Sequence, residues 1–343
     1  MWNLRAGLRS DDVVVVTGAS SGLGRATAIE FAKGGCRVVL AARRAPDLDE
    51  VAELCRSAGG QALVVVTDVT RESDVQALAE AACTKWGKID VWINNAGVTL
   101  FAPITEGPFE DHRRVIETNL FGAMHGARAS APIFKVQGQG VLINVGSVIS
   151  KIGQPFVPAY AISKFGLRAL SDSLRAELSD YPDIHVCSIY PYTIDTPHFQ
   201  SGGNRVGKHA RALPPVQSPE KIARAIVKLA ARPRRELHVP RYAVLGLLAH
   251  SLFPDTTERL LLHALRRWHF DRTVQPVTTG NLYNPVEVHE GSVHGERRPQ
   301  LSTPRFLAWS AGEFVRMQLA RRNGRTRGRQ GPPRESALVG GAK

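Results

Sequence analysis

Cysteine is scarce in this chain and is never clustered. The four cysteines among its 343 residues are Cys36, Cys55, Cys83 and Cys187, with no Cys-x-x-Cys pair and no clustering with histidine. Disulfide scaffolds and zinc sites need close, repeated spacings of such residues. The sequence therefore predicts neither a disulfide framework nor a metal site, and it favours a reducing, cytoplasmic compartment.

Long apolar runs are also absent. The first residues, MWNLRAGLRSDD, contain no apolar core of signal-peptide length, so we expect no secretion signal. The apolar run YAVLGLLAHSLF falls short of the roughly 20 residues that span a bilayer. Together with the amphipathic DTTERLLLHALRRWHF it forms the segment 242–268, for which two interpretations stay open. It is either a helical hairpin that covers the core or an interfacial anchor that gives peripheral membrane contact.

Acidic residues are too few to balance the basic ones, and the formal net charge is +13. Much of the surplus lies after Leu319, in a stretch rich in Arg and Gly that lacks aromatic residues. Such a composition favours a disordered tail over residues 320–343. The tail is either simply solvated or adheres to phosphate groups; we expect the first, and no nucleic-acid partner.

What the chain does contain, up to about residue 240, is an alternation of short β-branched runs with longer helical stretches. Several runs are apolar almost throughout, as in parallel strands covered by helices on both faces. The pattern predicts an α/β fold, a Rossmann-like doubly wound parallel sheet of about seven strands, with a helical and irregular C-terminal extension. We expect strands at Val13–Val16, Arg37–Ala41, Ala62–Val66, Ile89–Ile93, Val141–Val145, Ile184–Tyr190 and Glu236–Val239.

A glycine-rich loop joins the first expected strand to the first helix in VVVVTGASSGLGRATAIEFAKGG. Glycine at Gly18, Gly22 and Gly24 lets backbone N–H groups approach a pyrophosphate, whose charge is stabilised at the helix N-terminus. We expect Ser20, Ser21 and Leu23 to line the same loop. The sequence therefore predicts a dinucleotide-binding domain over residues 1–240, followed by the extension 241–319.

The end of the second strand indicates which dinucleotide is bound. An acid there would bond a ribose 2′-hydroxyl, but this chain has Ala42 followed by Arg43 and Arg44. A guanidinium can bind a 2′-phosphate with two hydrogen bonds and stack on adenine. The sequence favours NADP(H).

A tyrosine and a lysine four residues apart, Tyr160 and Lys164, are expected on one face of a helix. Hydride reduction of a carbonyl needs a proton donor at the developing alkoxide. A nearby ammonium can lower the pKa of a tyrosine enough for this role. Ser147, at the end of the strand VLINVGS, can bond the same substrate oxygen. We expect these three side chains to form an acid–base site.

These motifs, taken together over about residues 10 to 240, resemble the classical short-chain dehydrogenases/reductases. The matching pattern is Thr17, Gly18, Gly22 and Gly24, followed by NNAG and by the Ser147, Tyr160 and Lys164 set. The resemblance implies that Asn119 holds a water for proton relay, and that dimers or tetramers form through the helices carrying Asn119 and Tyr160. It also implies further cofactor contacts, at Asp68, Val69, Asn95, Ala96, Gly97, Pro191, Ile194 and Thr196. The segment TGNLYNPVEVHEGSVHGERRP is similar to C-terminal extensions of a bacterial subset of the family, to which no function is assigned here.

One position departs from the family pattern. Tyr192 stands where the family usually has glycine, in PYTIDT, and we expect its ring to reshape the substrate pocket. The long polar segment that follows, residues 196–218, is expected to be a mobile substrate lid.

The sequence thus predicts an NADP(H)-dependent oxidoreductase that interconverts a secondary alcohol and a ketone or aldehyde, with a hydrophobic substrate and Tyr160 as acid and base. The alternative is a catalytically weak NADP(H)-binding sensor or interaction protein, at a membrane surface if the segment 242–268 is exposed.

Overall fold

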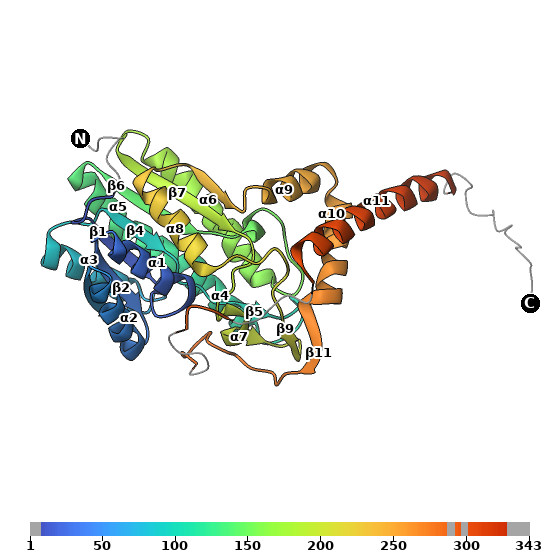
Figure 1. The fold of residues 1–343 in the computed structure, drawn as a ribbon, viewed down its shortest axis with the longest axis horizontal. Helices are drawn as coiled ribbons and strands as arrows, with labels where there is room; N and C mark the ends of the chain where they lie inside the picture. The colour runs from blue at the N-terminus through green and yellow to red at the C-terminus, as the bar shows by residue number, and fades with distance from the viewer. Residues whose placement is uncertain (1–7, 287–291, 296–300, 328–343) are drawn as a thin grey trace, which may run out of the picture.

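A parallel sheet of seven strands forms the centre of the molecule in the computed structural model, which describes residues 8–286, 292–295 and 301–327 (Figure 1). Its spatial order is β10-β7-β6-β4-β1-β2-β3, and every neighbouring pair is parallel. This confirms the predicted α/β fold. The strands are β1 (Val13–Thr17), β2 (Arg37–Ala42), β3 (Gln61–Val66), β4 (Val91–Asn94), β6 (Gly140–Val145), β7 (Ile184–Pro191) and β10 (Glu236–Val239).

The sheet forms because its strands are apolar on both faces. In β1, Val14 and Val16 pack into one core cluster, and Val13 and Val15 pack into the other. Successive side chains of a strand point to opposite faces, so a run of valines supplies both cores at once. Helices cover the two faces: α1 (Gly22–Lys33), α2 (Ala45–Ser57) and α8 (Pro219–Ala231) on one, and α3 (Glu72–Trp86), α5 (Gly122–Gln137) and α6 (Pro158–Glu177) on the other, with α4 (Phe109–Ile116) beside α6.

The strand order places a ligand site at one rim. From β1 the chain builds the sheet outward through β2 and β3, and then returns to add β4 on the other side of β1. Ligands of open parallel sheets bind at such a reversal, outside the carboxyl ends of the strands. The residues that end β1, β4, β6 and β7 therefore meet at this rim.

The segment expected as a lid contains short elements that pair with distant parts of the chain. In it lie α7 (His198–Ser201), β8 (Gly203–Asn204) and β9 (Lys208–Ala210). Strand β8 pairs with β5 (Leu100–Phe101), and β9 pairs antiparallel with β11 (Phe270–Val274) from the extension. The lid is thus held between the core domain and the extension.

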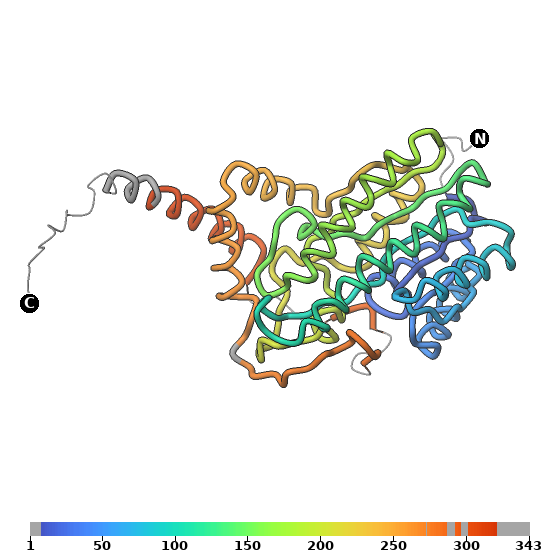
Figure 2. The backbone as a smooth tube through the Cα atoms, turned by 180° about the vertical axis from the view of Figure 1, so that it is seen from behind, coloured from blue at the N-terminus to red at the C-terminus, as the bar shows by residue number. Residues whose placement is uncertain are grey.

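The extension is mostly helical, as predicted. It comprises α9 (Ala243–Leu252), α10 (Pro254–Ala264), the π-helical turn η3 (Leu265–His269) and α11 (Thr303–Arg327). Figures 1 and 2 show these helices at one side of the sheet, with α11 projecting away from the core. The π-helical turn η1 (Glu117–Phe121) and the short 3-10 turn η2 (Val148–Ser150) belong to the core domain.

The structure differs from the prediction at the end of the extension. Helix α11 continues to Arg327, so it enters the segment 320–343 that we expected as a disordered tail; residues 328–343 lie outside the described residues. Within the described parts of the chain, no helix is both long and apolar enough to cross a bilayer.

Candidate active site

The phosphate loop joins the end of β1 to the start of α1 in a conformation that needs glycine. Gly18 and Gly22 have positive φ angles of +68° and +53°. A Cβ atom at Gly24 would lie 2.0 Å from the carbonyl oxygen of Gly18. The loop backbone is therefore packed too closely for side chains, and it leaves the N-terminus of α1 facing a cavity that Ser20, Ser21 and Leu23 also line.

The turn after β4 braces this loop. The Thr17 hydroxyl donates to the carbonyl of Ile93 at 3.1 Å and accepts from the backbone N–H groups of Asn95 and Ala96 at 3.0 and 3.1 Å. The Asn95 side chain donates to the Thr17 carbonyl at 2.8 Å. Asn95, Ala96 and Gly97 line the cavity, and the Asn95 amide also fixes the phosphate loop from behind.

The two arginines expected at a 2′-phosphate contact the C-terminal extension. Arg43 donates to the carbonyls of Asn281 and Tyr283 at 2.8 and 2.9 Å, and Arg44 donates to the carbonyl of Val286 at 2.8 Å. The residues 278–286, here called the strap, therefore cross the end of the cleft at which Arg43 and Arg44 lie.

Buried and polar contacts anchor the strap. Leu282 is fully buried among Val98, Leu100 and Val115, and the Tyr283 hydroxyl donates to Asp111 at 3.0 Å. Further along, the backbone N–H of Gly22 donates to the carbonyl of Ser292 at 2.9 Å. The sequence predicted only an irregular loop here, because all of these partners are distant in the chain.

Asp68 and Val69 lie beside the same end of the cavity. Asp68 accepts hydrogen bonds from the backbone and hydroxyl of Thr70 at 3.0 and 2.8 Å and pairs with Arg114 at 3.2 Å. Those bonds and the arginine lower the pKa of Asp68 against the opposing effect of burial. Asp68 is therefore an ionised acceptor at the rim.

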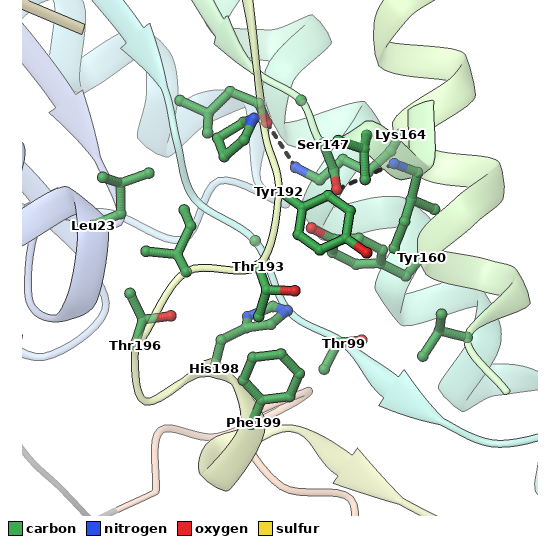
Figure 3. Close-up of a pocket in the computed structure, with 18 of the residues that line it drawn as sticks. Leu23, Thr99, Ser147, Tyr160, Lys164, Tyr192, Thr193, Thr196, His198 and Phe199 are labelled. Carbon is green, nitrogen blue, oxygen red and sulfur yellow. Dashed lines mark hydrogen bonds between the residues drawn. The ribbon is translucent and has the colours of Figure 1, made fainter. Parts of the chain in front are cut away.

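At the other end of the cavity, Ser147 follows β6, and Tyr160 and Lys164 lie on α6. Figure 3 shows the three side chains gathered on one side of the pocket, with Leu23 and Thr196 across it. The Lys164 ammonium donates to the carbonyl of Val145 at 2.8 Å and lies 5.5 Å from the centre of the Tyr160 ring. The fold thus brings Ser147, Tyr160 and Lys164, which the sequence motif predicted to act together, into one cluster.

Burial dominates the electrostatics of this cluster. It raises the pKa of Tyr160 to about 12, against the lowering effect of a hydrogen bond with Ser147, and it lowers the pKa of Lys164 to about 8. We expected Lys164 to lower the pKa of Tyr160, but the net shift is upward because a buried phenolate loses its hydration. Tyr160 is therefore protonated at neutral pH.

Asn119 lies in the π-helical turn η1 between α4 and α5. Single π turns inside helices are frequent at functional sites. Its side chain is buried: it accepts from the backbone N–H of Val98 at 2.8 Å and donates to the Val98 carbonyl and the Ser163 hydroxyl at 2.9 and 3.1 Å. Asn119 therefore ties the helix of Tyr160 to the loop after β4.

A comparison of the sequence with models of known protein families agrees with the observed fold. The family model described as short chain dehydrogenase matches residues 12–205, which is more than half of the chain. The chain belongs to this family.

One relative is similar over more of the chain than the family model covers. The uncharacterized oxidoreductase YxnA of Bacillus subtilis (strain 168) is 35% identical over 280 residues, covering 80% of this chain and 78% of that protein. The uncharacterized oxidoreductase Lin0452 of Listeria innocua is 35% identical over 185 residues, 54% of this chain and 75% of that protein. Among solved structures, an alcohol dehydrogenase from the archaeon Thermococcus sibiricus, complexed with 5-hydroxy-NADP, has a TM-score of 0.58. It is 27% identical and covers 66% of this chain and 94% of that one.

In this short-chain dehydrogenase, the segment after β7 closes the pocket from the lid side. Pro191 ends β7, and the backbone N–H of Tyr192 donates to the carbonyl of Val239 at 2.8 Å. The Tyr192 ring points into the same part of the pocket as Ser147 and Tyr160 (Figure 3). Ile194 and Thr196 also line the cavity.

Two residues of α7 that lie close to Tyr160 in the pocket, His198 and Phe199, were not singled out from the sequence. The imidazole of His198 lies with its centre 5.6 Å from that of the Tyr160 ring, and Phe199 stacks on Phe101 at 6.2 Å. Burial, with the nearby Lys164 charge, lowers the pKa of His198 to about 4, so the ring is neutral at neutral pH. No local pattern in the sequence indicates them, because α7 is only four residues long and no motif spacing includes it.

The cysteines and the possible metal ligands were also compared with the sequence prediction. All four cysteines are free, and across residues 8–286, 292–295 and 301–327 no three His, Cys, Asp or Glu side chains are grouped so as to hold a metal ion. Titratable side chains that line the pocket around Tyr160 include Lys164, Tyr192, His198 and His269.

Proposed function

We propose that this short-chain dehydrogenase uses NADP(H) to interconvert a secondary alcohol and a ketone or aldehyde, with Tyr160 as acid and base. One observation carries the proposal. A single cavity of about 920 Å³ is lined by the phosphate loop, by Arg43 and Arg44, and by the Ser147, Tyr160 and Lys164 cluster.

The end of the cavity that is lined by the phosphate loop, Arg43 and Arg44 suits a dinucleotide. The close-packed Gly18–Gly24 backbone leaves N–H groups at the start of α1 for a pyrophosphate. Arg43 and Arg44, after Ala42, offer cations and no carboxylate at the ribose 2′ position. The Thermococcus sibiricus protein, which was solved with an NADP derivative, supports the same choice. Asp68, Val69, Ala96, Gly97, Ile194 and Thr196 would complete the binding cleft.

At the second end the residues have distinct roles. When bound, the nicotinamide supplies or accepts the hydride. In the reductive direction, protonated Tyr160 donates its proton to the substrate oxygen, and the Ser147 hydroxyl bonds the same oxygen. The Lys164 ammonium, near the Tyr160 ring, stabilises the phenolate that results. Asn119 is a positioning residue, because its contacts fix the helix that carries Tyr160.

The decisive assay compares the wild type with Tyr160→Phe, following NADPH consumption over ketones, aldehydes and quinones. We expect the variant to lose 10²–10⁴-fold in kcat, the usual contribution of general acid catalysis. NADPH titration serves as the control, because the phenyl ring should leave cofactor binding within about threefold. Equal rates for the two proteins would reject Tyr160 as the proton donor.

Cofactor preference has its own test. Removing the guanidinium in Arg43→Ala should weaken NADPH binding at least tenfold more than NADH binding, since both dinucleotides lose the hold of Arg43 on the strap but only NADPH loses a charge-assisted contact with a 2′-phosphate. Fluorescence titration with both dinucleotides measures this. Equal losses for the two would show that Arg43 acts only by holding the strap.

The second candidate function is an NADP(H) sensor with little turnover. The observation that favours it is Tyr192, which is half-buried, lines the pocket beside Tyr160 and has a pKa raised to about 12 by desolvation. Tight NADPH binding without turnover on the whole panel, restored by Tyr192→Gly, would support the sensor. Activity of the wild type would reject it.

Peripheral membrane contact through residues 242–268 is a further proposal about location. Leu248, Leu252 and Phe253 on α9 and after it are 54%, 72% and 43% exposed. Such a cluster can insert into an interface. Co-sedimentation with liposomes that persists at high salt, and is lost in Leu248→Ser/Leu252→Ser, is the expected result; no binding would place the protein in the aqueous phase.

A further inference from the structure

The cavity does not end at Tyr160. It continues between the three helices of the extension, and each helix turns one face toward it. On α10 the lining residues are Thr257, Leu260, Leu261 and Ala264, at the 3-1-3 spacing of a single helical stripe. On α11 they are Phe306, Leu307, Ser310, Ala311 and Phe314, and on α9 they include Ala243, Gly246, Leu247 and Ala249. We call this part of the cavity the extension channel.

The walls of the extension channel are uncharged. The described residues that α9, α10 and α11 contribute carry aliphatic, aromatic or hydroxyl side chains, with no acid, lysine or arginine among them. Toward the reaction centre the walls continue through Leu213, Pro215 and Phe199. Placing a charged group there would cost its hydration without a partner, so the channel selects uncharged apolar molecules.

Small side chains keep the extension channel open. Gly246 stands on its α9 wall, and a Cβ atom built there would meet no atom within 4 Å. Ala249, Ala264, Ser310 and Ala311 add further short side chains. Three packed helices normally interdigitate large residues and close such gaps. The gap therefore has the form of a binding space.

Helix α9 is largely apolar, and such a helix is normally buried, but here it is exposed. AVLGLLAHSL is apolar on most of its surface, yet none of its residues is fully buried, and Leu245 on the channel wall is 68% exposed. An apolar helix without a covered face carries a cost in water. An apolar molecule in the channel would cover Leu245 and the other residues of α9 that line it.

We propose that the extension channel holds the long, uncharged, apolar body of the alcohol or ketone whose oxygen lies at Tyr160. The inference rests on the proposed function and narrows its substrate class. The C-terminal extension, which lies outside the family-matched residues 12–205, is then the element that recognises the substrate.

A homologous series tests chain length in the wild type. Reduction of 2-alkanones from 2-butanone to 2-undecanone should show kcat/KM rising about fourfold per added methylene, the ratio that corresponds to about 0.8 kcal/mol. The rise continues as long as added carbons enter the channel. A flat series with measurable turnover would overturn the channel and leave the proposed function standing.

A matched pair of glycine variants tests the location. Gly246→Leu fills open space in the channel, whereas Gly312→Leu on α11 also meets no neighbour within 4 Å but lies outside the cavity lining. The kcat/KM ratio of 2-undecanone to 2-butanone should fall at least tenfold in Gly246→Leu and stay within twofold in Gly312→Leu. Equal ratios in the two variants would overturn the channel.

A binding measurement separates the two proposals. N-phenyl-1-naphthylamine, an uncharged apolar fluorophore, should bind the wild type, be displaced by 2-undecanone, and bind at least tenfold more weakly to Gly246→Leu than to Gly312→Leu. If the probe binds in this way but the wild type reduces none of the 2-alkanones, the channel is supported and the proposed function is rejected. Probe binding that is equal in both variants would reject the channel.

Discussion

At the scale of single residues, the site depends on backbone closeness and on burial. Gly24 is required because the carbonyl of Gly18 occupies the place of a side chain. Tyr160 and Lys164 are shifted in opposite directions because burial penalises the charged form of each: the pKa of the phenol rises to about 12 and that of the amine falls to about 8. Both facts lead to measurements on single substitutions.

Gly24→Ala should damage the phosphate loop. The added methyl would lie 2.0 Å from the Gly18 carbonyl oxygen, so the loop has to move. We expect the Kd for NADPH to rise at least tenfold in a fluorescence titration. Gly312→Ala, where a Cβ meets nothing within 4 Å, is the control and should bind normally with a slightly higher Tm. An unchanged Kd in Gly24→Ala would mean that the loop does not hold the pyrophosphate.

Lys164 predicts a pH dependence of stability. Its folded pKa of about 8 lies below its unfolded value of about 10.4, so between these values only the unfolded chain binds the proton. Stability then rises with pH across this window, and the cost of burying the ammonium is fully present below about pH 8. Lys164→Met removes the cost. Its free energy of unfolding relative to the wild type should therefore fall by about 2–3 kcal/mol from pH 7 to pH 10.

Urea unfolding of both proteins at several pH values checks this. The absolute difference also contains the hydrogen bond from Lys164 to the carbonyl of Val145, so the slope is the diagnostic quantity. A difference that does not change with pH would mean that Lys164 keeps its ordinary pKa in the folded protein.

At the scale of elements, the strap is the connection that the sequence did not reveal. Its carbonyls accept hydrogen bonds from two distant arginines. Arg43 and Asn281 are 238 residues apart in the chain, and Arg44 and Val286 are 242 residues apart. Helices α9 to α11 and the seven strands were predictable, since hydrophobic periodicity is local. The strap has no periodicity, and its course is decided by its contacts with the core.

Leu282→Ala should loosen the strap. Leu282 is fully buried, and truncating a buried leucine costs about 2–5 kcal/mol, here concentrated on the docking of one segment. Because the strap crosses the end of the cleft at which Arg43 and Arg44 lie, we expect NADPH to bind and to dissociate at least fivefold faster in stopped-flow fluorescence. Val277→Ala, a 56% exposed neighbour, is the control. Unchanged rates in a folded Leu282→Ala protein would show that the strap does not cover the cofactor.

At the scale of the whole molecule, exposed apolar side chains remain on the helices that carry Asn119 and Tyr160. Phe121 and Met124, at the end of η1 and the start of α5, are 46% and 39% exposed. Ile162 and Phe165 on α6 are 51% and 42% exposed. Apolar side chains concentrated in this way are typical of an interface between subunits. The family resemblance implies dimers or tetramers through the same helices.

Phe165→Arg should therefore reduce the molar mass measured by light scattering after size exclusion, toward that of one chain. The cause is a charge placed in an apolar contact. Leu54→Arg on α2, in the opposite helical layer and 38% exposed, should leave the assembly intact. A wild type that is monomeric at micromolar concentration would contradict the interface.

The sequence by itself determined the seven-stranded sheet and the glycine loop after β1, and it predicts a set of catalytic residues. Predicted strand bounds lie within about two residues of the observed ones, because β-branched apolar runs and glycine turns act through neighbours in the chain. Ser147, Tyr160 and Lys164 could be predicted because their spacing places them together, and Asn119 because the family resemblance implies it.

Only the tertiary structure decided what surrounds those residues. Burial and contacts between segments far apart in the chain decide four features. They are the direction of the pKa shift of Tyr160, the position of His198 beside it, the contact of the strap with Arg43, and the extension channel. Such contacts leave no periodic trace in the sequence. They arise when separate elements exclude water from the same space, and that depends on how the whole chain packs.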